Sequence, residues 1–237
     1  MKFRNIVPGL DRLTDNPTVP RHRHLHAYAT IIVSGTLEES SYAGRVRAIP
    51  GDVLIHPDLD AHANNRISST LKLIRLPWRD RDGSGSLQHL RNLDEIVRAA
   101  EKDVQEATAL LVAALAGGLP GCPGEQNDWP DRLAGDLALN PAMSLGTWAE
   151  DHDLARETVS RGFTKAYGIA PEVFRAELRT KAAWFRITRE SERLGTIATE
   201  TGFADQAHMS RWVHRLTGLS PMAWRHKLSL IRLGAGG

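Results

Sequence analysis

Five histidines near the start of the chain have the type and spacing that could bind a metal or a small polar ligand. His22, His24 and His26 alternate with other residues in PRHRHLHAY, and His56 and His62 follow a Pro-Gly pair in IPGDVLIHPDLDAHANN. In an extended strand every second side chain lies on the same face, so the first three imidazoles would share a face. Imidazole nitrogens suit zinc, iron, nickel and copper, and three of them can hold a metal with one coordination position left open.

A second group of polar residues lies toward the other end of the chain, in TGFADQAHMSRWVHRLTGLSP, residues 201–221. The stretch combines a glycine corner, a helix-like run and a second glycine shortly before a proline. Gln206, His208 and Arg211 carry side chains that can bind base edges and phosphates of DNA. The alternative is that they form an ordinary solvated helix face.

This stretch has an earlier copy in the same chain. VSRGFTKAYGIAPEVFR (159–175) aligns with MSRWVHRLTGLSPMAWR (209–225) at an offset of fifty residues. Each copy follows a short amphipathic segment and a tight turn, which we place at Asp153 and at Gly202. We therefore predict two helix-turn-helix units, each ended by a glycine C-cap and joined by a helix over 171–188. The identical pairs are Ser160/Ser210, Arg161/Arg211, Gly168/Gly218, Pro171/Pro221 and Arg175/Arg225.

The second helix of each unit has two different faces. Val159 and Phe163 are four residues apart, as are Met209 and Val213, so these side chains should pack inward. The opposite faces carry polar and charged side chains. A recognition helix needs this division, because one face holds it to its domain while the other enters the major groove.

Ile197 to Arg225 resembles the second helix-turn-helix of the AraC family of bacterial transcription regulators, and Leu145 to Pro171 resembles the first. The shared features are an Ile-Ala helix, a Gly-Phe corner, an Arg in the recognition helix, a Gly-x-Ser-Pro exit and a Trp-Arg end. The resemblance implies that one monomer places two recognition helices in successive major grooves, about 34 Å apart. By position, the residues implied in DNA binding are Arg156, Glu157, Ser160, Arg161, Lys165, Gln206, Ala207, His208, Arg211 and Arg215.

The first copy departs from the family pattern at two residues. Gly162 stands where the family usually has a larger residue, and glycine inside a helix costs about 1 kcal/mol relative to alanine. Glu157 would repel phosphate unless it accepts a hydrogen bond from a cytosine amino group.

The histidine motifs resemble the two halves of a cupin β-barrel over residues 20–77, and AraC-type regulators often carry such a domain as an effector sensor. A metal-binding cupin would also use a glutamate soon after the first motif. The stretch AYATIIVSG has none, and the acidic pair at 38–39 lies beyond the next turn.

Two kinds of site are therefore open for these histidines. The best metal-binding set is His24, His26 and His62, with His22 and His56 as substitutes. We favour a small-molecule pocket that requires no cofactor, with a divalent transition metal as the alternative. The residues expected to line the pocket are His22, His24, His26, Tyr28, Ile32, Ile55, His56 and His62.

The elements that must position these residues follow from the hydrophobic pattern. Short β-branched runs with Gly-containing turns predict strands over 28–76, and from Leu87 the period changes to that of helices at 84–100 and 102–116. The helical pair either packs on the barrel or forms a homodimer interface. We expect a multidomain α+β chain, with a cupin-like β-barrel and the helical pair (84–116) in residues 1–120, a linker at 121–130, and an all-α domain with two helix-turn-helix units in residues 131–237.

Composition is compatible with this division. Residues 1–130 carry 15 basic and 16 acidic side chains, a balance of −1, whereas residues 131–237 carry 15 and 12, a balance of +3. The positive balance permits nucleic-acid binding by the second part. The single cysteine, Cys122, allows no disulfide within the chain, and no apolar run suggests a signal peptide or a membrane span, so we expect a cytoplasmic protein without a membrane partner.

The sequence thus predicts a sequence-specific, DNA-binding transcription regulator that responds to a small-molecule or metal effector and is not an enzyme. Its partners would be double-stranded DNA, the effector, RNA polymerase and a second copy of the chain. The alternative is a metal-dependent cupin enzyme, of the dioxygenase or isomerase type, with a helical accessory domain. Such an enzyme would hold its metal tightly and turn over a substrate.

Overall fold

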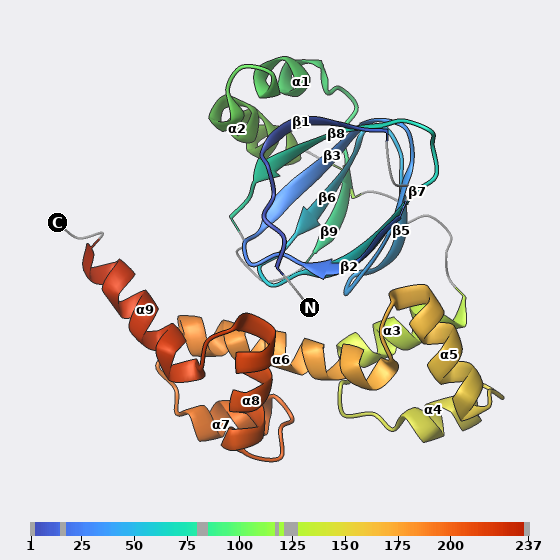
Figure 1. Ribbon diagram of the computed structural model, residues 1–237, viewed down its shortest axis with the longest axis vertical. Coiled ribbons are helices and arrows are strands. Elements are labelled where there is room, and N and C mark those ends of the chain that lie inside the picture. Colours follow the sequence, from blue (N-terminus) through green and yellow to red (C-terminus); the bar gives the residue numbers. More distant parts are fainter. Residues whose placement is uncertain (1–2, 15–17, 80–84, 117–118, 121–127, 235–237) are drawn as a thin grey trace. The chain divides into compact units, whose positions relative to one another are not determined.

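The computed structural model describes residues 3–14, 18–79, 85–116, 119–120 and 128–234 (Figure 1). The chain divides into two compact units, residues 1–132 with 165–168 and residues 133–164 with 169–237. Residues 121–127 of the expected linker lie outside the described residues.

The first unit is built on two antiparallel sheets. One has six strands in the order β1-β8-β3-β6-β9-β10, and the other has four in the order β2-β7-β4-β5. Over the described residues no strand pairing joins the two sheets, so the expected cupin-like barrel takes the form of two open sheets. The strands are β1 (Gly9–Leu13), β2 (Thr18–Arg23), β3 (Tyr28–Ser34), β4 (Leu37–Ser41), β5 (Gly44–Ala48), β6 (Asp52–His56), β7 (Ala61–Arg66), β8 (Leu71–Pro77), β9 (Ser86–His89) and β10 (Leu119–Pro120).

The Pro-Gly turn before β6 is present as the sequence predicted. Gly51 has a φ of +97°, which L side chains rarely adopt. A Cβ at this position would lie 2.6 Å from His89 Cε1 and 2.9 Å from the carbonyl oxygen of Leu90. Glycine is therefore required here both by backbone conformation and by the close approach of the segment that follows β9.

Alternation along β3 separates two environments. Ala29 and Ile31 are fully buried on the side of the sheet covered by α1 (Asp94–Ala100) and α2 (Val104–Leu115), in a core that includes Leu111 (Figure 1). Tyr28 and Thr30 point the other way and line a cavity. The helical pair therefore packs on the sheet, which was one of its two expected roles, while the homodimer interface stays a prediction.

The first expected helix, at 84–100, is wrong in its N-terminal half. Residues Ser86–His89 form strand β9, in which Leu87 pairs with Leu54 of β6. The three-residue spacing of leucines imitates a helix, but the edge of β6 carries backbone groups that need hydrogen-bond partners, and this segment supplies them. The helix begins only at Asp94, and the second helix begins close to its expected start, after the N-cap Asp103.

The remaining part of the chain is helical, as predicted. The inward positions Val159, Phe163, Met209 and Val213 are all buried. Among the described residues, no helix combines the length and the apolar character needed to cross a membrane. The helices are α3 (Trp129–Leu139), α4 (Leu145–Asp151), α5 (Arg156–Tyr167), α6 (Pro171–Arg189), α7 (Leu194–Glu200), α8 (Gln206–Thr217) and α9 (Pro221–Gly234).

Candidate ligand pocket and nucleic-acid interface

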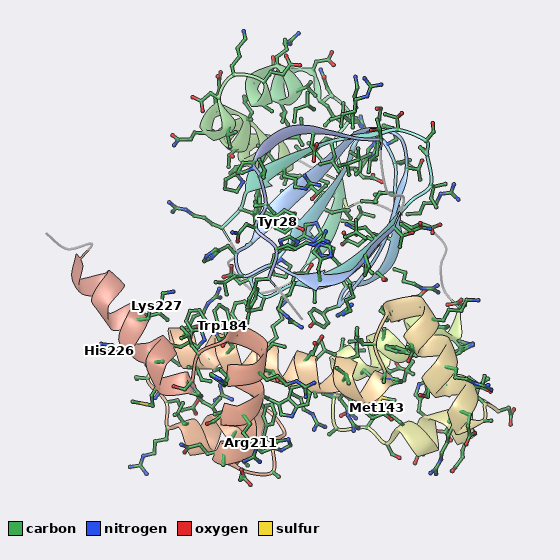
Figure 2. The ribbon with its side chains drawn as sticks, in the orientation of Figure 1. Tyr28, Met143, Trp184, Arg211, His226 and Lys227 are labelled. Atoms are coloured by element: carbon green, nitrogen blue, oxygen red, sulfur yellow. The ribbon has the colours of Figure 1, made fainter. Side chains whose placement is uncertain are left out.

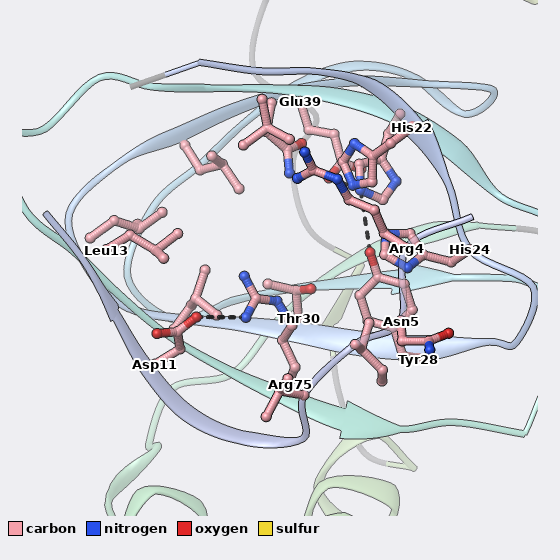
Figure 3. Close-up of a pocket in the computed structure, with 18 residues that line it drawn as sticks. Arg4, Asn5, Asp11, Leu13, His22, His24, Tyr28, Thr30, Glu39 and Arg75 are labelled. Carbon is pink, nitrogen blue, oxygen red and sulfur yellow. Dashed lines mark hydrogen bonds and ion pairs between the residues drawn. The ribbon is translucent and has the colours of Figure 1, made fainter. Parts of the chain in front are cut away.

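A cavity of about 220 Å³ lies within the first unit, lined by residues of both sheets and of the N-terminal segment (Figure 3). Its lining combines imidazole, phenol, carboxyl and guanidinium groups with aliphatic side chains. The lining residues are Arg4, Asn5, Ile6, Val7, Asp11, Leu13, Val19, His22, His24, Tyr28, Thr30, Leu37, Glu39, His62, Asn64, Leu71, Leu73 and Arg75.

Three of the expected histidines meet at this cavity. His22 on β2 lies directly opposite His62 on β7, with ring centroids 4.5 Å apart, and the His24 ring stacks 5.2 Å from that of His62. Each offers one nitrogen, and these three atoms lie within 4.8 Å of one another. All three side chains are buried, so their nitrogens can bind a ligand without competition from bulk water.

Hydrogen bonds orient two of these rings. His22 Nδ1 lies 3.0 Å from the carbonyl oxygen of Pro20, and His62 Nδ1 lies 3.0 Å from Asp60 Oδ2. A carbonyl or carboxylate oxygen can only accept, so each Nδ1 carries the proton and each Nε2 keeps a lone pair. The Nε2 of His62 faces the hydroxyl of Tyr28 at 3.3 Å.

His24 differs from the other two rings. Both of its ring nitrogens are buried, and neither makes a well-formed hydrogen bond with a described residue. Burial, together with the neighbouring His22 and His56, lowers the pKa of His24 to about 4. A buried polar group without a partner costs free energy, so this imidazole is suited to pair with something bound in the cavity.

Behind His62 lies a buried network of acids and bases. Asp60 Oδ2 accepts hydrogen bonds from His62 and from His56, both at 3.0 Å. Burial alone would raise the pKa of Asp60, but these two hydrogen bonds outweigh it and hold the pKa well below its usual range. Burial raises the pKa of Glu39 to about 7 against the opposing effect of His56, whose Nδ1 is 3.6 Å away.

The structure does not bring all the expected pocket residues together. His26 is exposed, because β2 ends at Arg23 and the strand alternation stops before it. Ile32 is buried in an apolar core with Leu37, and Ile55 packs on the opposite side of its sheet, toward the helical pair. The trio that meets is thus His22, His24 and His62, rather than His24, His26 and His62.

The second helix-turn-helix holds its recognition helix by a set of local backbone interactions. The corner follows α7, where Gly202 has a φ of +78° and the amide of Phe203 donates to the carbonyl of Ala198 at 2.9 Å. Asp205 caps α8 by accepting from the amide of His208 at 2.6 Å. Gly218 ends the helix in the left-handed conformation that a C-cap requires.

The outward face of α8 presents basic and polar groups. Gln206, Ala207, Arg211 and Arg215 are exposed, and Arg211 lies on this helix as Figure 2 shows. His208 is half-buried, and its Nε2 accepts a hydrogen bond from Trp212 Nε1 at 3.1 Å. The implied DNA contacts of α8 are therefore accessible, with His208 held in one orientation.

The first helix-turn-helix presents an equivalent face on α5. Arg156, Glu157, Ser160, Arg161 and Lys165 are all exposed. Arg156 Nη2 lies 3.3 Å from Glu150 Oε1, and Arg161 Nε donates to the backbone carbonyl of Glu157 at 3.4 Å. The basic groups of this copy are thus partly engaged by their own unit.

The two helix-turn-helix copies differ in the length of their turns. Residues 152–155 separate α4 from α5, whereas residues 201–205 separate α7 from α8. The left-handed residue of the first turn is Asp153, with a φ of +51°, where the second has Gly202. At the offset of fifty the N-cap Asp205 corresponds to Ala155, whose side chain has no oxygen that could accept a hydrogen bond from the first turn of α5.

The family described as "Helix-turn-helix domain" matches residues 148–227, a span that includes both turns and both recognition helices. Residues 148–227 form an AraC-type helix-turn-helix domain. The AraC-type domain binds double-stranded DNA, and the chain is a DNA-binding transcription regulator. No curated protein matches the chain.

Several solved structures are similar to this chain at low identity. The C-terminal domain of AraT, a response regulator from Geobacillus stearothermophilus, is 19% identical, with 41% of this chain and 84% of that chain covered and a TM-score of 0.39. The DNA-binding domain of AdpA in complex with a target DNA is 20% identical, with 45% and 97% covered and a TM-score of 0.42. ToxT from Vibrio cholerae, with an unsaturated fatty acid bound, is 9% identical, with 91% and 92% covered and a TM-score of 0.40.

Sequence reasoning missed one aromatic residue of the AraC-type domain. Trp212 donates to His208, four residues earlier, and its ring lies 5.1 Å below the guanidinium of Arg215, three residues later. These intervals place all three side chains on one helical face, so the spacing could have revealed the contact. By contrast, Glu39 lines the cavity and Asp60 binds His62 behind it, and no local sequence pattern predicts either position.

Proposed function

We propose that the chain regulates transcription by placing α5 and α8 in successive major grooves of one promoter site. The observation that carries this proposal is the repeated helix with a buried apolar face and an exposed basic face, Arg161 being equivalent to Arg211. Arginine binds guanine in a bidentate manner and also contacts phosphate. Lys165 and Arg215 supply phosphate contacts at the following turn, and the other exposed residues of each helix lie close enough to contact base edges.

The cavity of the first unit is the proposed effector site. Its volume of about 220 Å³ lies below the range of about 300–1,000 Å³ typical of drug-sized ligands, so the effector should be small. The lining combines polar groups, among them the histidines, Tyr28 and Glu39, with the aliphatic side chains of Leu13, Leu71 and Leu73. A small molecule that has both a polar group and a short apolar part fits this composition.

A divalent transition metal is the second candidate for this site. His22 and His62 each donate from Nδ1 to a neighbouring oxygen, an arrangement that fixes metal-binding imidazoles in other proteins. Together with His24 they form a donor set of three nitrogens, which suits zinc, iron, nickel or copper. A bound metal would supply a point of attachment for an effector, and we propose no catalytic step for it.

The DNA-binding part of the proposal is tested by footprinting the purified protein on the region upstream of its own gene. Affinity should fall steeply with salt, since Lys and Arg contacts to phosphate release counterions. Protection should cover two neighbouring major grooves on one face of the duplex. Absence of protection even at low salt would contradict the proposed regulation of that region.

The remaining partners are proposals of the same kind. We expect a cytoplasmic protein that meets RNA polymerase at the promoter, and a homodimer formed through the outer face of α2, where Val112 is 49% exposed. Elemental analysis of the purified protein and sedimentation measurements test metal content and dimerisation. A tightly held metal together with turnover of a small substrate would instead favour the cupin-enzyme alternative.

A further inference from the structure

Helix α6 runs between the two helix-turn-helix units and contributes to both (Figure 1). Arg179 lies in the middle of this helix. Its Nη1 donates to the carbonyl oxygen of Gly202 at 3.1 Å, and its Nη2 donates to the carbonyl oxygen of Pro141. Gly202 belongs to the turn of the second unit, and Pro141 belongs to the segment that leads into the first unit.

A guanidinium group is well suited to hold two carbonyls at a fixed separation. It is planar, it carries its N–H groups in a rigid fork, and it stays charged. The turn of the second unit packs directly on this group, since a Cβ added to Gly202 would lie 3.3 Å from Arg179 Nε. That Nε is itself buried, so the side chain lies in a defined position.

The mutual position of the recognition helices matters because successive major grooves recur at a fixed interval of about 34 Å. Two linked binding elements gain affinity over one only if their geometry lets both engage at once. We propose that Arg179 is a positioning residue that sets the mutual placement of α5 and α8, and thereby the spacing of the two half-sites that the protein accepts. This inference depends on the proposed two-groove binding.

The test begins with the full-length protein and a random library of duplex DNA, from which its preferred bipartite site is selected. Affinities are then measured for this site, for versions with one or two base pairs added or removed between the halves, and for each half alone. For Arg179→Met, we expect affinity for the bipartite site to fall on the order of tenfold, because part of the gain from linkage is lost. The preference for one spacing should flatten, and affinity for a single half-site should stay within about twofold.

Arg175→Met provides a matched control. Arg175 lies one turn earlier on α6 and donates to the carbonyl of Met143, which belongs to the first unit alone. The Arg175→Met variant should keep the spacing preference of the parent protein. Arg179→Lys retains the charge but lacks the fork, so it should behave like Arg179→Met, and it serves as the second variant if Arg179→Met fails to fold.

The outcomes separate the inference from the proposed function. The positioning role is overturned if Arg179→Met keeps the spacing preference of the parent protein. If Arg179→Met does not fold, the same result for Arg179→Lys overturns it. Equal losses on the bipartite site and on single half-sites also overturn it, because they indicate general destabilisation. If the library yields no bipartite site, the two-groove proposal itself is wrong, and the inference falls with it.

Discussion

The two units of the chain place their polar side chains in opposite environments. In the first unit His22, His24, His62, Glu39 and Asp60 are buried, and their pKa values are displaced by burial and by one another. In the second unit Arg156, Arg161, Arg211 and Arg215 of the recognition helices are exposed. Buried polar groups must find partners within the fold or in a ligand, whereas exposed cations remain available to a polyanion. The polar side chains of the first unit are therefore bound mainly to one another, whereas the basic side chains of the recognition helices are open to solvent.

The largest expected difference between the two units is in the free energy of unfolding, after removal of a buried carboxylate from the first unit. Asp60→Ala leaves two histidines without their shared acceptor, and removing one partner of a buried ionic network costs about 3–5 kcal/mol. We expect the free energy of unfolding, measured by urea titration of the full chain, to fall by this amount. Glu157→Ala removes an exposed carboxylate from α5 and should change it by no more than about 0.5 kcal/mol. Equal changes in the free energy of unfolding for the two substitutions would contradict this difference between buried and exposed polar groups.

A second test uses pH. The folded pKa of His24 is lowered to about 4 by burial, whereas the unfolded pKa has the ordinary value of about 6.5. As the pH falls, the unfolded chain binds the proton at a higher pH than the folded chain does. The contribution of neutral His24 to the free energy of unfolding is therefore fully present above pH 6.5, and about 3 kcal/mol of it is lost as the pH falls toward 4. His24→Gln should remove this part of the pH dependence of unfolding.

The exposed His26 supplies the control for that measurement. His26→Gln changes the same residue type two positions away, outside the buried cluster. Its unfolding free energy should follow that of the parent protein over the same pH range. If the unfolding free energy of His24→Gln depends on pH as that of the parent protein does, His24 is not held in its neutral form by the fold.

The smallest effect concerns the recognition helices. Arg211→Ala should weaken binding to the selected DNA site by about 1–3 kcal/mol, the cost of one bidentate base contact, while the unfolding free energy stays within about 0.5 kcal/mol. Arg161→Ala should cost less in DNA affinity, since the Nε of Arg161 already donates to the carbonyl of Glu157. Fluorescence anisotropy titrations measure both. A larger loss of DNA affinity for Arg161→Ala than for Arg211→Ala would contradict this order of the two recognition helices.

Most of the helical region could be predicted from the sequence because its signals are local. Each recognition helix shows a four-residue apolar repeat, with Val159 and Phe163 in one copy and Met209 and Val213 in the other. Gly168 and Gly218 have the positive φ values that their C-cap positions predicted. Such features depend on residues within one or two helical turns, so a linear pattern records them.

The pocket was less predictable because it depends on where strands end and how they pair. His22 and His24 do meet, but β2 ends at Arg23, so the expected alternation does not extend along the chain to His26, which is exposed. Register places His22 opposite His62, and the packing of the first unit brings Glu39 to the same cavity. No local pattern carries this information, since sheet register is set by contacts between distant segments.

The sequence by itself determined a strand-rich first part, a duplicated helix-turn-helix and the basic residues on its outward faces, because periodicity and turn chemistry act over a few neighbouring residues. Only the tertiary structure decided which histidines meet, that Glu39 and Asp60 join them, and that Ile55 faces the helical pair. It also decided that one guanidinium on α6 contacts both the turn of the second helix-turn-helix and the segment that leads into the first. These outcomes depend on contacts between residues that are far apart in the chain. Their positions are fixed by the packing of whole elements, which no short stretch of sequence contains.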